Sequence, residues 1–245
     1  MALDGALFAR AAGLLEPDPW QVGLLRSSAQ QKILLMSRQA GKSTLSSVLG
    51  LHTAIFQPGS LVLCLAPALR QSQELFRKIK SAYAELGPDV CPVTKENALE
   101  LEFDHGSRIV CLPGKESTIR GFSGAALLLV DEASRVPDEL YQAVRPMLAV
   151  SGGQIVLLST PFGQRGFFHR EWTEGGPGWE RLKVRAVDVP RIPAAWLAEE
   201  RARIGDWWYR QEYDCEFVTT EDQVFSYEAV MGALSTEVQP LFGGM

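Results

Sequence analysis

The stretch Ser37-Arg38-Gln39-Ala40-Gly41-Lys42-Ser43-Thr44 restricts the possible folds of this chain more than any other feature. It follows a short apolar run at residues 33–35 and precedes a segment with helical spacing from Leu45 to Phe56. A strand, a tight loop ending in Gly-Lys-Ser and a helix together are typical of a phosphate-binding loop. Backbone N–H groups at such a helix start point at one spot, which the helix dipole makes electropositive. We therefore expect this stretch to bind the phosphates of a nucleotide.

Three residues of the loop have predictable roles. Lys42 is expected to reach the outer phosphates, and the Ser43 hydroxyl to ligate Mg²⁺. Gly41 allows close approach because a side chain there would keep the backbone away from a phosphate. The usual pattern has a further glycine at the position that Met36 occupies here. The alternative is therefore an ordinary strand–turn–helix with a chance Gly-Lys-Ser, and the rest of the chain must decide.

Size and charge narrow the class of protein. The 245 residues suit one large α/β domain, or one domain with a small appendage, and the 46% hydrophobic share supports a sizeable core. No apolar run approaches the roughly 18 residues of a membrane span, and the N-terminus lacks a signal-peptide pattern, so we expect no membrane partner. The net charge of −5 gives no basic footprint for nucleic acid.

The cysteines give no indication of a metal site or of disulfides. Cys64, Cys91, Cys111 and Cys215 are scattered, without a CxxC motif or a cluster with histidine. Such spacing favours buried free thiols in a reducing compartment. His105 falls between two alternating apolar runs, where a turn residue is the expected role.

A second motif lies about 90 residues after the loop, where the apolar run Leu127–Val130 ends in Asp131-Glu132. A strand ending in two acids is typical of the second half of a phosphate-loop ATPase. Asp131 is expected to hold Mg²⁺, directly or through water, and Glu132 to orient and polarise the attacking water. The structural alternative is a strand that ends in a helix-capping aspartate.

Two further polar pairs fit a nucleotide site. Ser159-Thr160 ends another apolar strand, and hydroxyls there can sense the terminal phosphate; the alternative is a strand-end cap. Trp20-Gln21 opens a helix ahead of the loop, and a glutamine amide can read adenine because it both donates and accepts. A helix-capping or solvent-facing glutamine is the alternative.

The predicted elements alternate along the chain. We expect helices at 3–15, 45–56, 69–86, 137–150, 194–204, 206–217 and 227–234, a short helix from 165, strands at 61–67, 127–130, 154–159, 179–189 and 240–242, and a hairpin at 98–112. This order predicts an α/β fold with a mostly parallel central sheet and helices on both faces. Sites in such sheets lie beyond the carboxyl ends of the strands, where the motifs above converge.

Together the motifs resemble the ATPase domain of the large terminase subunit of tailed double-stranded DNA bacteriophages. The resemblance covers about residues 17–230 and depends on six segments in this order: Pro19-Trp20-Gln21, Ser37 to Ser43, Arg120-Gly121, Asp131-Glu132-Ala133, Ser159-Thr160-Pro161, and Tyr209 through Phe217. The family's loop accounts for Met36 at the usual glycine position. The resemblance implies a P-loop ATPase of the additional-strand, catalytic-glutamate type with a small C-terminal helical lid.

The same resemblance implies a function and partners. It implies that ATP and Mg²⁺ drive double-stranded DNA into a procapsid, with Lys42 and Glu132 as catalytic residues. Arg120 is expected to act in a neighbouring subunit's site and Arg38 in its own, and the sequence does not apportion the two. The implied partners are DNA, the portal protein, the small terminase subunit and further copies in a ring. A monomer is expected in isolation, and the host cytoplasm is the expected location.

The sequence also predicts domain boundaries, and it leaves two rival functions open. We expect the ATPase core at 1–189, the lid at 190–225 and a tail at 226–245 that leads toward a nuclease domain absent from this sequence. One rival is a helicase-like remodelling ATPase, which shares the loop and the acidic pair but needs a second ATPase-like domain. The other is a nucleotide-dependent assembly switch that hydrolyses slowly.

Overall fold

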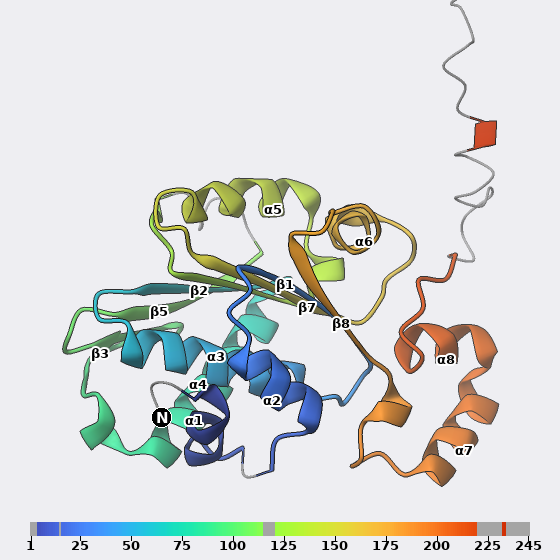
Figure 1. Cartoon of the computed structure of the whole chain (residues 1–245), viewed down its shortest axis with the longest axis horizontal. Coiled ribbons are helices and arrows are strands. Elements are labelled where there is room, and N and C mark those ends of the chain that lie inside the picture. Colours follow the sequence, from blue (N-terminus) through green and yellow to red (C-terminus); the bar gives the residue numbers. More distant parts are fainter. Residues whose placement is uncertain (1–3, 15, 115–120, 220–231, 234–245) are drawn as a thin grey trace, which may run out of the picture.

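The computed structural model describes residues 4–14, 16–114, 121–219 and 232–233 and contains one eight-stranded sheet (Figure 1). The strand order is β3-β4-β5-β2-β6-β7-β1-β8. The strands are β1 (Gln31–Met36), β2 (Leu61–Ala66), β3 (Val93–Glu96), β4 (Glu100–Phe103), β5 (Arg108–Pro113), β6 (Leu127–Asp131), β7 (Gln154–Ser159) and β8 (Trp179–Val184). The principal helices are α1 (Gly5–Ala11), α2 (Pro19–Arg26), α3 (Lys42–Phe56), α4 (Leu69–Leu86), α5 (Asp138–Val144), α6 (Gly166–Thr173), α7 (Ala194–Ile204) and α8 (Asp206–Glu212).

The sheet is parallel except at one edge. Strands β5, β2, β6, β7, β1 and β8 pair in parallel, and β4 pairs antiparallel with both β5 and β3. The β4–β5 pairing confirms the predicted hairpin. β3 was missed because Val93–Glu96 is mostly exposed and charged and lacks the alternation of a half-buried strand. β7 lies between β1 and β6, so the loop strand and the acidic strand are not neighbours.

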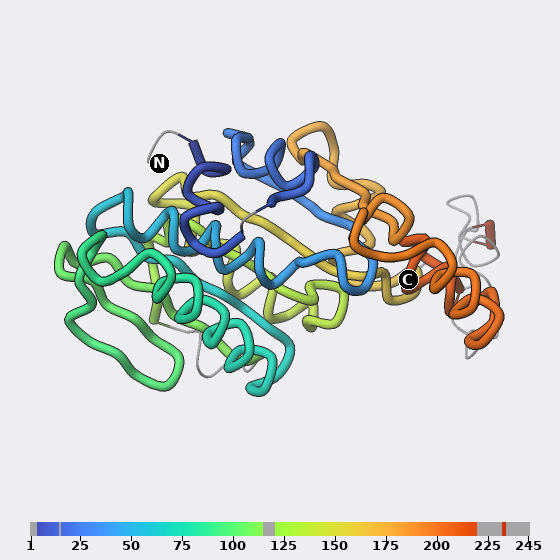
Figure 2. Tube along the Cα trace, turned by 90° about the horizontal axis from the view of Figure 1, so that it is seen from below, coloured from blue at the N-terminus to red at the C-terminus, as the bar shows by residue number. Residues whose placement is uncertain are grey.

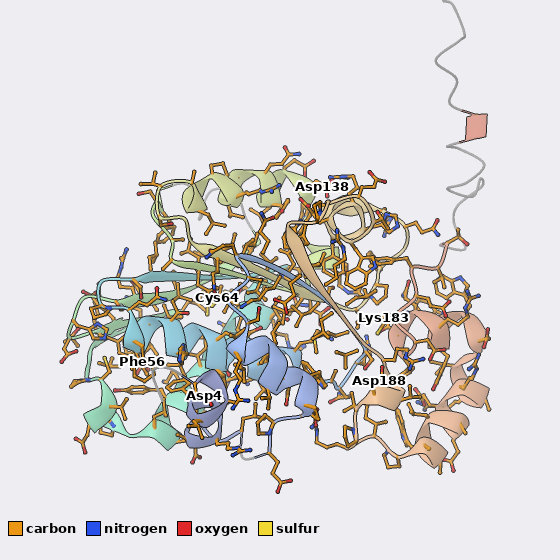
Figure 3. All side chains as sticks on the ribbon, in the orientation of Figure 1. Asp4, Phe56, Cys64, Asp138, Lys183 and Asp188 are labelled. Carbon is orange, nitrogen blue, oxygen red and sulfur yellow. The ribbon has the colours of Figure 1, made fainter. Side chains whose placement is uncertain are left out.

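Helices cover both faces of the sheet, which confirms the predicted fold class. α1 to α4 lie on one face and α5 and α6 on the other (Figures 1 and 2). Successive residues of β1 enter opposite layers: Leu34 packs with the α1–α4 side and Ile33 with the α5–α6 side. Side chains fill both layers, with Cys64 of β2 in the middle (Figure 3). A strand that is buried on both faces has a continuous run of apolar residues, and β2, β6 and β7 show this pattern in the sequence.

α7 and α8 lie at one end of the molecule, beyond β8 (Figure 2). They pack together around a small cluster that contains Leu197, Tyr209 and Tyr213. Tyr209 is buried in this cluster, whereas Trp208 is 48% exposed. The predicted domain boundaries at 189 and 225 stay predictions.

Several predicted element ends differ from the structure. The expected helix at 137–150 stops at Val144 and continues as a 3-10 turn, Arg145–Leu148, because Pro146 has no N–H to donate. The strand predicted to reach Val189 ends at Val184, and the helix predicted to reach Phe217 ends at Glu212. Arg120 and, apart from residues 232–233, the elements expected at 227–234 and 240–242 lie outside the described residues. In the described part, no helix combines the length and the apolar character that crossing a membrane requires.

Candidate nucleotide site

A cavity of about 460 Å³ opens beyond the carboxyl ends of β1 and β6. Its lining comes from the loop after β1, from α4, and from the segments that follow β6 and β7. The residues are Arg38, Gln39, Gly41, Lys42, Ser43, Thr44, Gln71, Glu74, Leu75, Lys78, Asp131, Glu132, Arg135 and Thr160. The structure thus brings the Gly-Lys-Ser loop and the acidic pair to one place, as the parallel sheet predicts.

The loop makes its turn with two left-handed residues. Gln39 has φ of 60° and Gly41 has φ of 90°, and Gly41 directly precedes α3. A glycine is favoured at φ of 90° because side chains rarely tolerate it. Met36, at the position where the usual motif has glycine, is the last residue of β1 and is fully buried. The loop therefore begins at Ser37, one residue after the position of the usual first glycine, and the Met36 side chain is part of the hydrophobic core.

The remaining loop residues contribute backbone rather than exposed side chains. Ser37 and Ala40 are fully buried and do not line the cavity with their side chains. The Lys42 ammonium donates to the Ser37 carbonyl oxygen at 3.1 Å, so the lysine folds back over the loop. Its Nζ also lies 3.7 Å from Glu132 Oε1. Lys42 and Glu132 therefore face the same small volume.

Asp131 and Ser43 lie next to each other on the cavity wall. The Ser43 hydroxyl donates to Asp131 Oδ2 at 3.1 Å. Burial, followed by the neighbouring Glu132 carboxylate, raises the pKa of Asp131 to about 6, and the Lys42 ammonium opposes that rise. A hydroxyl and a buried carboxylate oxygen are ligands that suit Mg²⁺, and the added positive charge would favour the ionised carboxylate. The residues present thus fit the predicted metal.

The hydroxyls at the end of β7 connect to the acidic segment. Ser159 Oγ accepts from the Ser134 backbone N–H at 3.1 Å, and the two hydroxyls lie 2.7 Å apart. The Ser159 hydroxyl also lies 3.5 Å from Glu132 Oε2, and the Ser134 hydroxyl donates to the Thr160 carbonyl at 2.8 Å. Ser159 is thus a strand-end cap, and it also contacts the predicted catalytic glutamate.

Gln21 borders a second cavity on the other side of the loop. This cavity, of about 440 Å³, is lined by Leu14, Glu16, Gln21, Gln39, Gly41, Thr44 and Arg191. The Gln21 amide oxygen accepts from the Asp18 backbone N–H at 2.8 Å, so the capping alternative is correct. Its amide nitrogen faces Gly41: a β-carbon added to Gly41 would lie 3.4 Å from that nitrogen. Gln21 therefore both caps α2 and faces the loop, whereas Trp20 packs against the core.

Arg38 is held by α8, which lies in the segment predicted to be the lid (residues 190–225). Its Nε donates to Glu212 Oε2 at 2.7 Å, and its backbone N–H donates to the Glu212 carbonyl at 3.0 Å. Glu212, at the end of α8, also lies 3.8 Å from an Arg135 nitrogen, and its side chain is only 9% exposed. The Arg135 guanidinium covers the Phe162 ring at 4.2 Å. A single buried carboxylate thus joins the loop, the segment after the acidic pair and the lid.

Several charged neighbours of the cavity or the loop were not predicted as site residues. They include Glu212, Arg135, Lys78 and Arg191. One terminal nitrogen of Arg191 donates to both carboxylate oxygens of Asp18, at 2.8 and 2.9 Å, although the two residues are 173 positions apart in the chain. Lys78 lies on α4, and nothing in the local sequence indicates that this face of the helix borders the loop. No sequence signal pairs Arg38 with Glu212, because the two lie 174 residues apart.

Comparison with known proteins identifies the family. The sequence model described as "Terminase large subunit, T4likevirus-type, N-terminal" matches residues 33–230. The large terminase subunit of Thermus phage G20c is 29% identical to this chain over an alignment of 246 residues in length. The alignment covers 86% of this chain and 50% of that protein. The Thermus phage P74-26 large terminase ATPase domain shares the fold, with a TM-score of 0.75, 24% identity, and 83% of this chain and 94% of that one covered.

A second solved structure, the large terminase of a thermophilic bacteriophage in complex with ADP, has the same fold at 13% identity. Its TM-score is 0.68, and the match covers 86% of this chain and 52% of that one. The chain spans about half the length of the curated relatives it matches. The family match contains the phosphate-loop residues, the acidic pair and the hydroxyls after β7. On this evidence the chain belongs to the terminase large subunit family.

Proposed function

We propose that this chain hydrolyses ATP and couples hydrolysis to movement of double-stranded DNA into a viral procapsid. The observation that carries the proposal is the convergence of a phosphate loop with two acids. Lys42 Nζ lies 3.7 Å from Glu132 Oε1, and Ser43 Oγ lies 3.1 Å from Asp131 Oδ2. A cation, a general base and two oxygen ligands around one cavity are the parts that phosphoryl transfer to water requires.

Each residue has a defined task in this proposal. The loop amides and Lys42 bind the phosphates and hold the terminal one for in-line attack. Ser43 and Asp131 would hold Mg²⁺, which neutralises charge on the phosphate oxygens when bound. Glu132 accepts a proton from the attacking water, and its contact with Lys42 keeps the carboxylate facing the phosphates. Ser159, in contact with Glu132, relays the state of this site to the segment after β7.

The arginines and partners follow from the family. Arg120 of one subunit is proposed to stabilise the developing charge in the site of the next, with Arg38 acting within its own subunit. Both the portal protein and the small terminase subunit are proposed partners of a homo-oligomeric ring in the host cytoplasm. Two structures of related proteins, a phage terminase ATPase domain and a phage terminase in complex with ADP, support the nucleotide part of the proposal.

A DNA-stimulated ATPase measurement on the assembled chain tests the motor. We expect phosphate release that depends on ATP and Mg²⁺ and rises with added double-stranded DNA under conditions where the chain forms rings. Slow release that DNA leaves unchanged in confirmed rings would favour the nucleotide switch instead.

A subunit-mixing experiment tests whether Arg120 acts in the site of a neighbouring subunit. Rings that contain both Arg120→Ala and Lys42→Ala subunits should regain part of the ATPase activity that rings of either variant alone lack, because each variant retains the group that the other lacks.

A Gln21→Glu substitution separates base recognition from helix capping. The carboxylate oxygen can still accept from the Asp18 N–H, but the donor facing Gly41 is lost. We expect KM for ATP to rise by about fivefold, the preference for ATP over GTP to shrink, and kcat to change little, because one polar contact is worth about 1 kcal/mol. Steady-state kinetics with both nucleotides measure this. Gln73→Glu, at an exposed position of α4, is the control; an unchanged ATP/GTP preference in Gln21→Glu would argue against base recognition.

A further inference from the structure

The β4–β5 turn and the segment after the 3-10 helix Pro88–Val90 meet in a cluster that ATP hydrolysis does not use. Cys91 Sγ lies 3.0 Å from His105 Nε2 and 3.7 Å from Asp104 Oδ1. One donor atom from each of the three residues lies within 4.8 Å of the others. We propose that Cys91, Asp104 and His105 bind a zinc ion that fastens this turn to the chain after α4.

The donor set matches the chemistry of zinc. A thiolate, an imidazole nitrogen and a carboxylate oxygen are ligands that Zn²⁺ takes at about 2.0–2.3 Å, and a tetrahedral site spaces them by roughly 3.3–3.6 Å. The 3.7 Å separation between Cys91 and Asp104 is close to that spacing, and the 3.0 Å separation between Cys91 and His105 must widen by about 0.5 Å. The Asp104 and His105 donor atoms lie within 4.8 Å of each other, so the exposed Asp104 side chain must supply any remaining closure. A thiolate and a carboxylate together carry two negative charges, which one Zn²⁺ neutralises. A water molecule would complete the fourth position.

The electrostatics around the cluster favour a cation. Within the described part of the chain, no lysine or arginine forms an ion pair with Asp104. Cys91 is 4% exposed, whereas Asp104 is exposed. The cluster is therefore closed on the thiol side and open on the carboxylate side, which gives a metal ion a route in and a place for the water ligand.

Backbone contacts hold the three ligands in place before any metal binds. The Tyr83 hydroxyl donates to the Cys91 carbonyl at 2.7 Å. The Asp104 N–H donates to the carbonyl of Pro92, the residue after Cys91, at 2.9 Å. The Gly59 N–H donates to the His105 carbonyl at 3.2 Å. Ligands that are already positioned lose little conformational freedom on binding, which raises affinity.

Metal binding changes one existing contact. The Ser107 N–H lies 3.4 Å from His105 Nδ1, which places the ring proton on Nε2 when this contact forms. Zinc at Nε2 needs the other tautomer, with the proton on Nδ1. The contact that is given up is long for a hydrogen bond, so its loss costs little. The thiol releases its proton to solvent as the Zn–S bond forms, so binding is accompanied by proton release.

The experiment uses the whole chain, first treated with a chelator and then titrated with Zn²⁺ and, as a spectroscopic probe, with Co²⁺. We expect one equivalent of Co²⁺ to produce a thiolate-to-cobalt absorption band in the near ultraviolet. This band separates the cluster from Ser43 and Asp131, which offer only oxygen. Zn²⁺ at about one hundred times its Kd should raise Tm by roughly 5–10 °C.

Matched variants decide the outcome. Cys91→Ser and His105→Ala are expected to weaken Co²⁺ and Zn²⁺ binding at least tenfold and to abolish the Tm rise. Asp89→Asn removes an exposed acid two residues from Cys91 and should leave both unchanged. If the Cys91 variant fails to fold, Asp104→Asn on the exposed turn takes its place, again with at least a tenfold loss. Absence of the band in the unaltered chain, or equal binding in the ligand variants and the control, would overturn the proposal.

Discussion

Replacing Glu132 with glutamine is expected to lower kcat for ATP hydrolysis by about 10²- to 10⁴-fold while ATP binding persists. The amide keeps the size of the carboxylate but cannot accept the proton of the attacking water, and general base catalysis contributes about this factor. Binding persists because the loop amides, Lys42 and Ser43 are unchanged. Losing the 3.7 Å contact with Glu132 also frees Lys42 for the phosphates, so Kd for ATP should stay equal or fall.

Single-turnover hydrolysis and equilibrium binding of ATP measure the two parts of this prediction separately. Glu139→Gln, which removes a carboxylate at the start of α5, outside the cavity lining, is the control and should keep kcat within about twofold of the unaltered chain. Retained hydrolysis in Glu132→Gln would remove Glu132 from the role of general base. Asp131 and Glu74 would then be the remaining carboxylates of the cavity lining.

Arg38→Ala is expected to lower hydrolysis by at least a hundredfold, whereas Glu212→Gln should tighten ATP binding several-fold. An arginine that stabilises charge on the transferring phosphoryl group is worth about 10³–10⁵ in kcat, and Arg38 shares that task with Arg120 in our proposal. In the structure Arg38 Nε bonds Glu212 at 2.7 Å, so the phosphates must compete with a buried carboxylate for the guanidinium. Removing the negative charge of Glu212 removes this competitor.

ATP titration and kcat measurements on both variants, alone and combined, test the link between loop and lid. Glu200→Gln is the matched control, because Glu200 is a second buried carboxylate of the lid that pairs with Arg203 instead, at 2.6 Å. We expect its ATP affinity to equal that of the unaltered chain. If Glu212→Gln binds ATP no more tightly than Glu200→Gln does, Glu212 does not compete for Arg38, and its contact is structural.

Much of the fold was predictable because its signals are local. The helix Leu69–Leu86 agrees with the prediction at both ends, since its apolar residues recur at helical spacing and Gly87-Pro88 stops it. The buried parallel strands were found from continuous apolar runs. β3 was missed because exposed charged residues on an edge strand carry no such pattern.

In the candidate site, too, some residues were predictable from local sequence and others were not. Lys42, Ser43, Asp131 and Glu132 were predictable because each follows or ends a strand, and parallel strands bring their carboxyl ends to one edge. The pairing of Arg38 with Glu212 was not predictable, because it depends on where α8 packs relative to the loop, which no local sequence pattern encodes.

By itself, the sequence determined the layered α/β architecture, the phosphate loop and the acids that face it, since periodicity and strand-end chemistry are properties of neighbouring residues. The tertiary structure alone decided which distant side chains meet: Glu212 with Arg38, Asp18 with Arg191, and Cys91 with His105. Their spacing along the chain follows no local pattern. Each contact exists because packing the helices and the hairpin against the sheet fixes where the loops end.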